Sequence, residues 1–249
     1  MYGVQLDQLA TVLSVTQRRA SAIVATWSTD GLADAARLGP GQRWVWLTRP
    51  GLVSCGLPYV AGAPGLSRLA HLRAVTAIRL ALAATPLYAE GSGYWRSERR
   101  LRARIGGRIG LREHVPDGEV HWPDSAPVPW AGECWAIEAE LTPKTLPRTA
   151  TIMTELLTRT GDYGCSAADA RVPGQPPRHS RAIYLCSPAA RPVVTRARDK
   201  IGPLAARVEI RLLPPGAELP ATPSRAPAPA PRRTRPKSAA TGRPAMDDA

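Results

Sequence analysis

Apolar residues near the N-terminus recur at the spacing of one buried helix face. Two groups stand at positions i, i+3, i+4 and i+7: Leu6, Leu9, Ala10 and Leu13 in the first, and Ala20, Ile23, Val24 and Trp27 in the second. Between them Thr16 is a favourable N-cap, and Gly31 can adopt the left-handed conformation that ends the second helix. The pattern therefore predicts two short amphipathic helices joined by a tight turn, which is the core of a helix-turn-helix.

A strand-like pattern follows these helices. Residues 38–42 are rich in turn formers, and residues 43–48 alternate as in a strand. We expect a hairpin that forms the wing of a winged helix-turn-helix over residues 1–55. The alternative interpretation is a generic helical hairpin with a solvated basic face. A complete winged helix usually carries another helix before this pair, whereas only five residues precede Leu6.

Beyond a loop rich in glycine and proline at residues 56–65, helix and strand patterns mix. Apolar periodicity predicts helices over residues 66–84, 94–105, 145–160 and 189–201, and strands over residues 112–120, 134–141, 181–186 and 208–213. The fold class is therefore α+β, with a second domain over residues 66–213. Residues 214–249 are dominated by Pro, Ala, Ser and Arg, and we expect them to be disordered because they cannot bury enough apolar surface.

The charge balance points to a polyanionic partner. The formal net charge is +13, and the six basic and two acidic residues of 221–249 leave +9 on the rest of the chain. A basic folded part favours nucleic acid, although a GC-rich genome also enriches Arg, Ala, Pro and Gly. No segment approaches the roughly 18 apolar residues of a membrane span, and no leader with a cleavage site is visible. We therefore expect a cytoplasmic protein with no membrane contact.

Cysteine and histidine are scattered along the chain. The cysteines form no CxxC pair, which argues against a zinc ribbon or a dense disulfide framework: Cys55, Cys134, Cys165 and Cys186. We interpret them as reduced and mostly buried. The histidines are interpreted as structural or substrate-facing rather than as zinc ligands: His71, His114, His121 and His179.

Polar residues at the start of the second helix avoid its apolar stripe. Arginine can pair bidentately with guanine, and glutamine with adenine, so these types suit a helix that enters the major groove. The expected DNA-binding residues lie on this helix and on the hairpin: Thr16, Gln17, Arg18, Arg19, Ser21 and Arg43.

Carboxylates mark a second candidate site. Asp117 follows Pro116, and Glu138 and Glu140 share one face of a strand whose other positions are apolar. Burying two carboxylates on an apolar strand costs free energy unless a cation pairs with them. Asp117 and Glu138 are candidate ligands for Mg²⁺ or Mn²⁺, which can activate water and stabilise a cleaved phosphodiester. The alternative is that Asp117 lies in an ordinary turn and that the two glutamates pair with arginines.

Residues 94–213 resemble the PD-(D/E)xK nuclease superfamily. Pro116 and Asp117 match the "PD", Glu138 matches the (D/E), and Glu98 matches an acidic residue often found on a helix before the sheet. The motif's lysine position holds Glu140, and the nearest lysine is Lys144; some restriction endonucleases with this departure still cleave. The resemblance thus implies Asp117, Glu138, Glu140 and Lys144 as catalytic residues of a restriction-endonuclease-like domain.

An ordered series of segments resembles the replication-relaxation family of actinobacterial plasmids and integrative elements. The series comprises residues 43–51, 69–71, 95–99, 114–118 and 136–144. The resemblance implies a part in plasmid replication or in DNA relaxation and mobilisation, with double-stranded DNA as the partner.

Three functions fit these observations. The first is a DNA-binding accessory protein of a mobile element, with a winged helix that reads DNA and a nuclease-like domain that grips it without cutting. The second is a metal-dependent DNA endonuclease or nickase. The third is a scaffold for a relaxase or replication initiator that uses exposed tryptophans such as Trp122 and Trp130.

Overall fold

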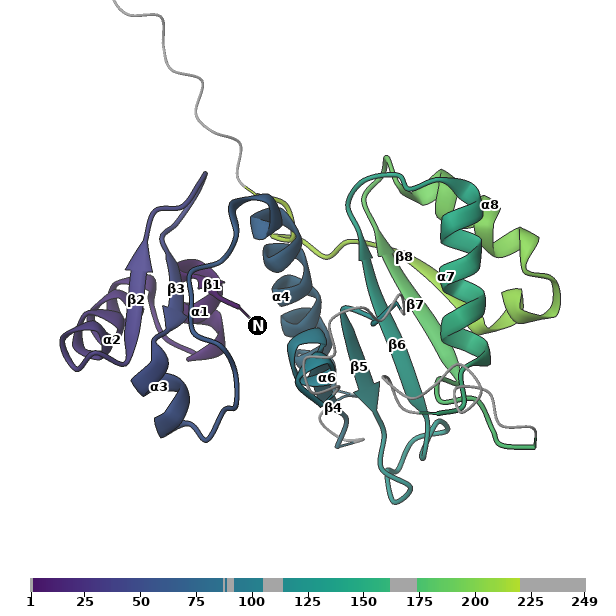
Figure 1. The fold of residues 1–249 in the computed structure, drawn as a ribbon, viewed down its shortest axis with the longest axis horizontal. Coiled ribbons are helices and arrows are strands. Elements are labelled where there is room, and N and C mark those ends of the chain that lie inside the picture. Colours follow the sequence, from purple (N-terminus) through teal and green to yellow (C-terminus); the bar gives the residue numbers. More distant parts are fainter. Residues whose placement is uncertain (1, 87, 89–91, 105–113, 162–173, 220–249) are drawn as a thin grey trace, which may run out of the picture.

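The protein has a mixed α+β architecture built on two sheets (Figure 1). The computed structural model describes residues 2–86, 88, 92–104, 114–161 and 174–219. The predicted disorder of residues 220–249 falls outside these ranges. No helix in the described ranges has the length and apolar character that a membrane crossing requires.

The N-terminal unit follows the predicted order of two helices and a hairpin. Its elements are β1 (Val4–Gln5), α1 (Leu6–Val12), α2 (Gln17–Thr29), β2 (Ala33–Ala36), β3 (Trp44–Leu47) and α3 (Arg49–Ser54). The three strands form an antiparallel sheet in the order β1-β3-β2. The Thr16 hydroxyl accepts a hydrogen bond of 3.3 Å from the Arg19 amide, so the predicted N-cap is confirmed. The sequence pattern had not indicated β1 or α3.

Helix α4 (Leu69–Ala83) lies between the two sheets (Figure 1). A 3₁₀ turn, Leu66–Arg68, leads into it. On one side Arg73 pairs with Asp7 of α1 at 2.8 Å, and its backbone carbonyl accepts from Gln8 at 2.9 Å. On the other side Ile78 packs in the core of the larger sheet. This helix therefore joins the N-terminal unit to the second sheet.

The second sheet has five strands in sequence order: β4 (Tyr94–Ser97), β5 (Gly118–His121), β6 (Cys134–Glu140), β7 (Arg181–Cys186) and β8 (Val208–Leu212). Strands β4, β5 and β6 form an antiparallel meander, whereas β6, β7 and β8 are parallel. Parallel neighbours need crossover connections, which α7 (Leu146–Thr158) and α8 (Arg191–Lys200) supply. A 3₁₀ segment, Gly202–Arg207, leads into β8.

Helices cover both faces of this sheet (Figure 1). Met153, Leu156 and Leu157 of α7 pack with Tyr184 of β7 on one face. Helix α4 and a group of tryptophans cover the other face. Because β6 and β7 are buried on both sides, they carry nearly continuous apolar runs, interrupted on β6 by Glu138 and Glu140.

Two predicted elements begin at other residues than expected. The helix predicted for residues 94–105 is strand β4 for its first four residues, and only α6 (Glu98–Arg104) is helical. Pairing of β4 with β5 overrides the local helical pattern. The strand predicted for residues 112–120 is β5, which begins at Gly118, after Pro116. Residues 105 and 112–113 lie outside the described ranges.

Two further predictions need correction. Disorder was predicted from Pro214, but Ala217 is buried and Leu219 packs beside Trp44, because this segment closes over α4. Trp122 was expected to be exposed, yet it is 5% exposed and packs edge-on against Trp130 at 5.6 Å between ring centroids. Trp122 therefore belongs to the core and is not a docking surface.

Candidate functional site

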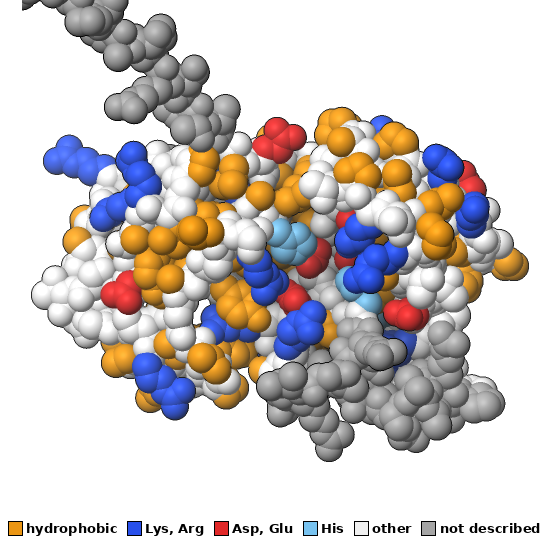
Figure 2. Space-filling model, turned by 45° about the horizontal axis from the view of Figure 1, so that its top comes forward, with side chains coloured by type: hydrophobic (Ala, Val, Ile, Leu, Met, Phe, Trp, Pro, Cys, Tyr) orange, Lys and Arg blue, Asp and Glu red, His pale blue; other side chains and the backbone are white. Residues whose placement is uncertain are grey.

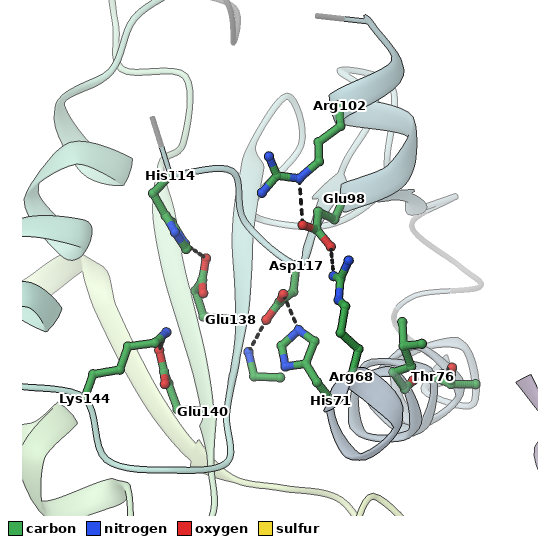
Figure 3. A network of polar contacts seen from close by, with 12 residues as sticks. Arg68, His71, Thr76, Glu98, Arg102, His114, Asp117, Glu138, Glu140 and Lys144 are labelled. Atoms are coloured by element: carbon green, nitrogen blue, oxygen red, sulfur yellow. Dashed lines mark hydrogen bonds and ion pairs between the residues drawn. The ribbon is translucent and has the colours of Figure 1, made fainter. Parts of the chain in front are cut away.

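Strand pairing brings three acidic residues to the same end of the meander. Ser97 pairs with Gly118, so Glu98, which follows β4, lies beside Asp117, which precedes β5. The Glu98 amide donates to the Asp117 carbonyl at 3.1 Å. Gly118 in turn pairs with Ile137, so Glu138 begins the part of β6 that extends past the start of β5. Figure 3 shows the Asp117 carboxylate between those of Glu98 and Glu138.

Asp117 is held in place by both of its carboxylate oxygens. Oδ2 accepts from the Ala139 amide at 2.9 Å, and Oδ1 lies 2.6 Å from Nε2 of His71 on α4. Burial works against protonation of His71, but the hydrogen bond and the charge of Asp117 outweigh it and raise the pKa of this histidine. His71 therefore carries positive charge against Asp117 more readily than a free histidine does.

Glu138 is a buried carboxylate with a histidine partner. Its side chain is 2% exposed, and Oε1 lies 2.6 Å from Nε2 of His114. Burial, together with the charge of Asp117, raises the pKa of Glu138 to about 7, although His114 and Lys144 oppose the rise. The pKa of His114 is raised too, since the attraction of Glu138 exceeds the effect of its burial. The two groups therefore titrate as a coupled pair.

The remaining two carboxylates are also paired with cations. Lys144, in the loop after β6, donates to Oε1 of Glu140. Glu98 accepts from Arg68 at 2.8 Å and from Arg102 at 2.7 Å. Figure 3 shows all four carboxylates of this site, each facing its own basic partner.

The chemistry of this site depends on whether the basic partners can move aside and leave the carboxylates to bind a metal cation. Asp117 and Glu138 fit a divalent cation by donor type, because carboxylates supplemented by water are what Mg²⁺ prefers. In the described residues, however, neither belongs to a group of three ligand atoms that lie within 4.8 Å of one another. The structure thus brings Glu98, Asp117 and Glu138 together as neighbours. Their carboxylate oxygens are paired with basic side chains of the protein itself.

The residues expected to contact DNA lie on one exposed surface. Thr16, Gln17, Arg18 and Arg19 are exposed at the start of α2, and Ser21 is half-buried. Arg43, the residue before β3, donates to the Ser21 hydroxyl at 3.0 Å, so the hairpin contacts this helix. Neither Arg18 nor Arg19 forms an ion pair with any described residue. Their charges are therefore available to an external anion.

The face drawn in Figure 2 carries a polar centre. Histidine, acidic and basic side chains gather near its middle, whereas apolar side chains are spread over the outer parts. Basic residues of the carboxylate site are also partly exposed: the side chains of Arg68, Arg102 and Lys144 are 41%, 49% and 34% exposed.

A second polar cluster was not anticipated from the sequence. Glu119, Cys134 and His179 place one potential ligand atom each within 4.8 Å of the others, and this is the sole such group of three in the described residues. His121 joins it, with Nε2 at 2.7 Å from Glu119 and 3.5 Å from Cys134. A buried Glu–Cys–His group of this kind can hold a metal ion. Only the β5–β6 register, which pairs His121 with Cys134, could have revealed it.

The cysteines are only partly as predicted. Cys186 is buried, Cys134 is half-buried, and Cys55 is exposed because it ends the short helix α3 at the surface. Burial raises the pKa of both the Cys134 and the Cys186 thiols to about 12. Cys165 lies outside the described residues.

Comparison with known protein families, with curated proteins and with solved structures found no match to this chain. The assignment of function therefore depends on the geometry described above and on the resemblances of short motifs.

Proposed function

We propose that this protein binds double-stranded DNA, with α1 and α2 as a helix-turn-helix and the β2–β3 hairpin as its wing. The observation that carries the proposal is the exposed pair Arg18 and Arg19 at the start of α2, which form no ion pair with any residue that the structure describes. The first residues of a recognition helix are those that meet base edges and phosphates. Arg43 reaches the same surface from the hairpin, which is where a wing contacts the duplex backbone.

The element order supports a nuclease-like second domain. An antiparallel meander β4-β5-β6, a crossover through α7 and a parallel strand β7 follow helix α4. This is the order expected of the PD-(D/E)xK core, with Asp117 and Glu138 at the matching strand ends. The ion pairs on all four carboxylates favour a domain that grips DNA over one that cuts it. This reading gives an accessory protein for the replication or relaxation of a mobile element, acting in the cytoplasm.

Binding of DNA is tested with the double variant Arg18→Ala/Arg19→Ala. We expect weaker affinity for duplex DNA in a fluorescence anisotropy titration. Loss of phosphate contacts flattens the salt dependence by about one unit per contact, whereas loss of a base contact relaxes sequence preference at about 1–3 kcal/mol. Arg196→Ala, an exposed arginine on α8, is the matched control and keeps wild-type affinity. Unchanged affinity in the double variant would remove the proposed recognition surface.

A metal-dependent endonuclease is the second candidate. The meeting of Glu98, Asp117 and Glu138 at adjacent strand ends favours it, because this is where a cation would bridge protein and phosphate. Asp117 and Glu138 would hold Mg²⁺ or Mn²⁺, Glu140 would orient water, and Lys144 would contact the scissile phosphate. Nicking of supercoiled plasmid that needs the metal and is lost in Glu138→Ala would establish this activity. Binding without nicking establishes the first.

A further inference from the structure

The Glu119 carboxylate lies at the centre of the second polar cluster. Its side chain is fully buried, and both oxygens are contacted by histidines: Oε1 at 2.9 Å from His179 and Oε2 at 2.7 Å from His121. The hydrogen bonds from these histidines and from Arg178 overcome the effect of burial and lower the pKa of Glu119. Glu119 is therefore a buried oxygen donor with a histidine against each of its two oxygens.

His179 has one ring nitrogen already committed. Its Nδ1 lies 2.9 Å from the Leu156 carbonyl of α7, and a carbonyl oxygen can only accept. Nδ1 thus carries a proton, and Nε2 is the atom that faces Glu119 and the interior of the cluster. An imidazole fixed in this way by a backbone carbonyl is the usual arrangement of a histidine metal ligand.

His121 and Cys134 complete the cluster from paired positions on β5 and β6. The Cys134 sulfur lies 3.5 Å from His121 Nε2, and the same nitrogen lies 2.7 Å from Glu119. Stacking on the Tyr94 ring, 5.0 Å between centroids, orients His121. Ligand atoms of Glu119, Cys134 and His179 all lie within 4.8 Å of one another, and His121 lies beside Glu119 and Cys134.

We propose that Glu119, His121, Cys134 and His179 form a binding site for a single zinc-type transition-metal ion. Imidazole and thiolate donors favour zinc and its late first-row neighbours, whereas Mg²⁺ and Ca²⁺ prefer oxygen alone. Four ligands suit the tetrahedral coordination of a structural site, in which ligand atoms lie about 3.3–3.8 Å apart. The Glu119–His121, Glu119–His179 and Cys134–His121 separations of 2.7, 2.9 and 3.5 Å are close to this range.

Arg178 defines the outer side of this site. Its Nε and an Nη donate to the two oxygens of Glu119 at 2.8 and 3.0 Å. A ligating carboxylate is commonly held by such an outer partner, which fixes its orientation. The ion would then connect β5 and β6 to the segment before β7, on the α7 side of the sheet. Ala136 separates Cys134 from Glu138 along this row of β6, so the site is distinct from the carboxylate site.

The test uses the full chain, freed of metal by a chelator and then titrated with Zn²⁺ or Co²⁺. We expect one zinc per chain after desalting, a higher melting temperature, and a thiolate-to-cobalt charge-transfer band. Cys134→Ser abolishes the band and weakens zinc binding at least about tenfold. The exposed Cys55→Ser is the matched control and keeps both properties.

Two further variants keep the proposal falsifiable if Cys134→Ser fails to fold. His121→Gln, at the solvent side of the cluster, shifts the cobalt spectrum, and Glu138→Gln leaves it unchanged. Wild-type protein that retains no stoichiometric metal would overturn the proposal. So would a charge-transfer band that survives in Cys134→Ser, an unaltered spectrum in His121→Gln, or loss of zinc in Glu138→Gln, since each would put the ion elsewhere.

Discussion

Glu138 of the candidate site lowers the stability of the fold that contains it. The residue occupies the middle of a strand whose neighbours are Ile137 and Ala139, both buried. A carboxylate placed there loses its hydration. The contact with His114 compensates for only part of that loss, as the raised pKa of Glu138 indicates. An apolar or amide side chain would suit this position better, so its acidic character points to a role outside folding.

Glu138→Gln should therefore stabilise the metal-free protein at alkaline pH. The folded pKa of about 7 lies above the ordinary value of 4.5, so the folded state binds more protons between these two values. Stability attributable to this group consequently falls as the pH rises from about 4.5 through 7. We expect the variant to gain about 1–3 kcal/mol at pH 8 and much less at pH 4.5, measured by urea unfolding with chelator present.

An exposed carboxylate provides the control for this measurement. Glu209→Gln on β8 removes an acid whose side chain is 43% exposed, and its effect should be small at both pH values. A variant Glu138→Gln that is less stable than wild type at pH 8 would mean that the His114 pairing outweighs the cost of burial.

At the scale of elements, α4 determines how the two sheets are joined. Arg73 is the central contact, because its buried guanidinium binds Asp7 of α1, the Gln5 side chain and the Glu218 carbonyl. His71, two residues earlier, contacts Asp117 of the larger sheet. One helix thus links the proposed DNA-reading unit to the carboxylate site.

Asp7→Asn should weaken this link. Arg73, 7% exposed, would keep its charge but lose its ionic partner, and breaking such a buried pair from one side costs several kcal/mol. Because Asp7 is 25% exposed, we expect a smaller loss of about 2–3 kcal/mol in urea unfolding. Asp34→Asn, an exposed residue on β2, is the matched control and should be neutral. Equal stability of both variants would show that α4 packs by its apolar contacts alone.

Elements with strong internal patterns were predictable, and those that depend on distant partners were not. β7 carries an apolar run that gives its bounds, and Thr16 and Gly31 delimit α2. Strand β1 has only two residues, and β4 becomes a strand because β5 pairs with it. Tertiary pairing therefore decided the elements that local pattern missed.

The same distinction applies to the sites. Glu138 could be singled out because it interrupts an apolar strand pattern, and Asp117 because it follows Pro116 as in the nuclease motif. Their partners could not: no local pattern tells that the helix carrying His71 covers the end of β5, or that the segment before β5 brings His114 to Glu138. His179 likewise reaches Glu119 across 60 residues of sequence.

At the scale of the whole molecule, the chain runs back to the N-terminal unit after β8. Residues 214–219 leave the larger sheet and run across α4, where Leu219 packs beside Trp44 of the N-terminal unit. The Glu218 carbonyl accepts from Arg73 at 2.8 Å, a contact that helps to fix α4 against both units. Residues 220–249 have the composition of a basic tail, and we expect them to add attraction to polyanions without sequence information.

Two truncations separate these roles. Ending the chain after Leu219 should leave the free energy of unfolding and the DNA sequence preference unchanged, while affinity at low salt falls because cationic side chains are lost. Ending it after Leu213 also removes the contacts of Ala217, Glu218 and Leu219, so Arg73 loses a hydrogen bond that is worth about 2 kcal/mol. We expect this second truncation to lower stability by at least that amount in urea unfolding.

If both truncations unfold at the same urea concentration, residues 214–219 do not hold the two units together. If the first alters sequence preference, the basic tail takes part in reading DNA, and recognition would extend beyond α2.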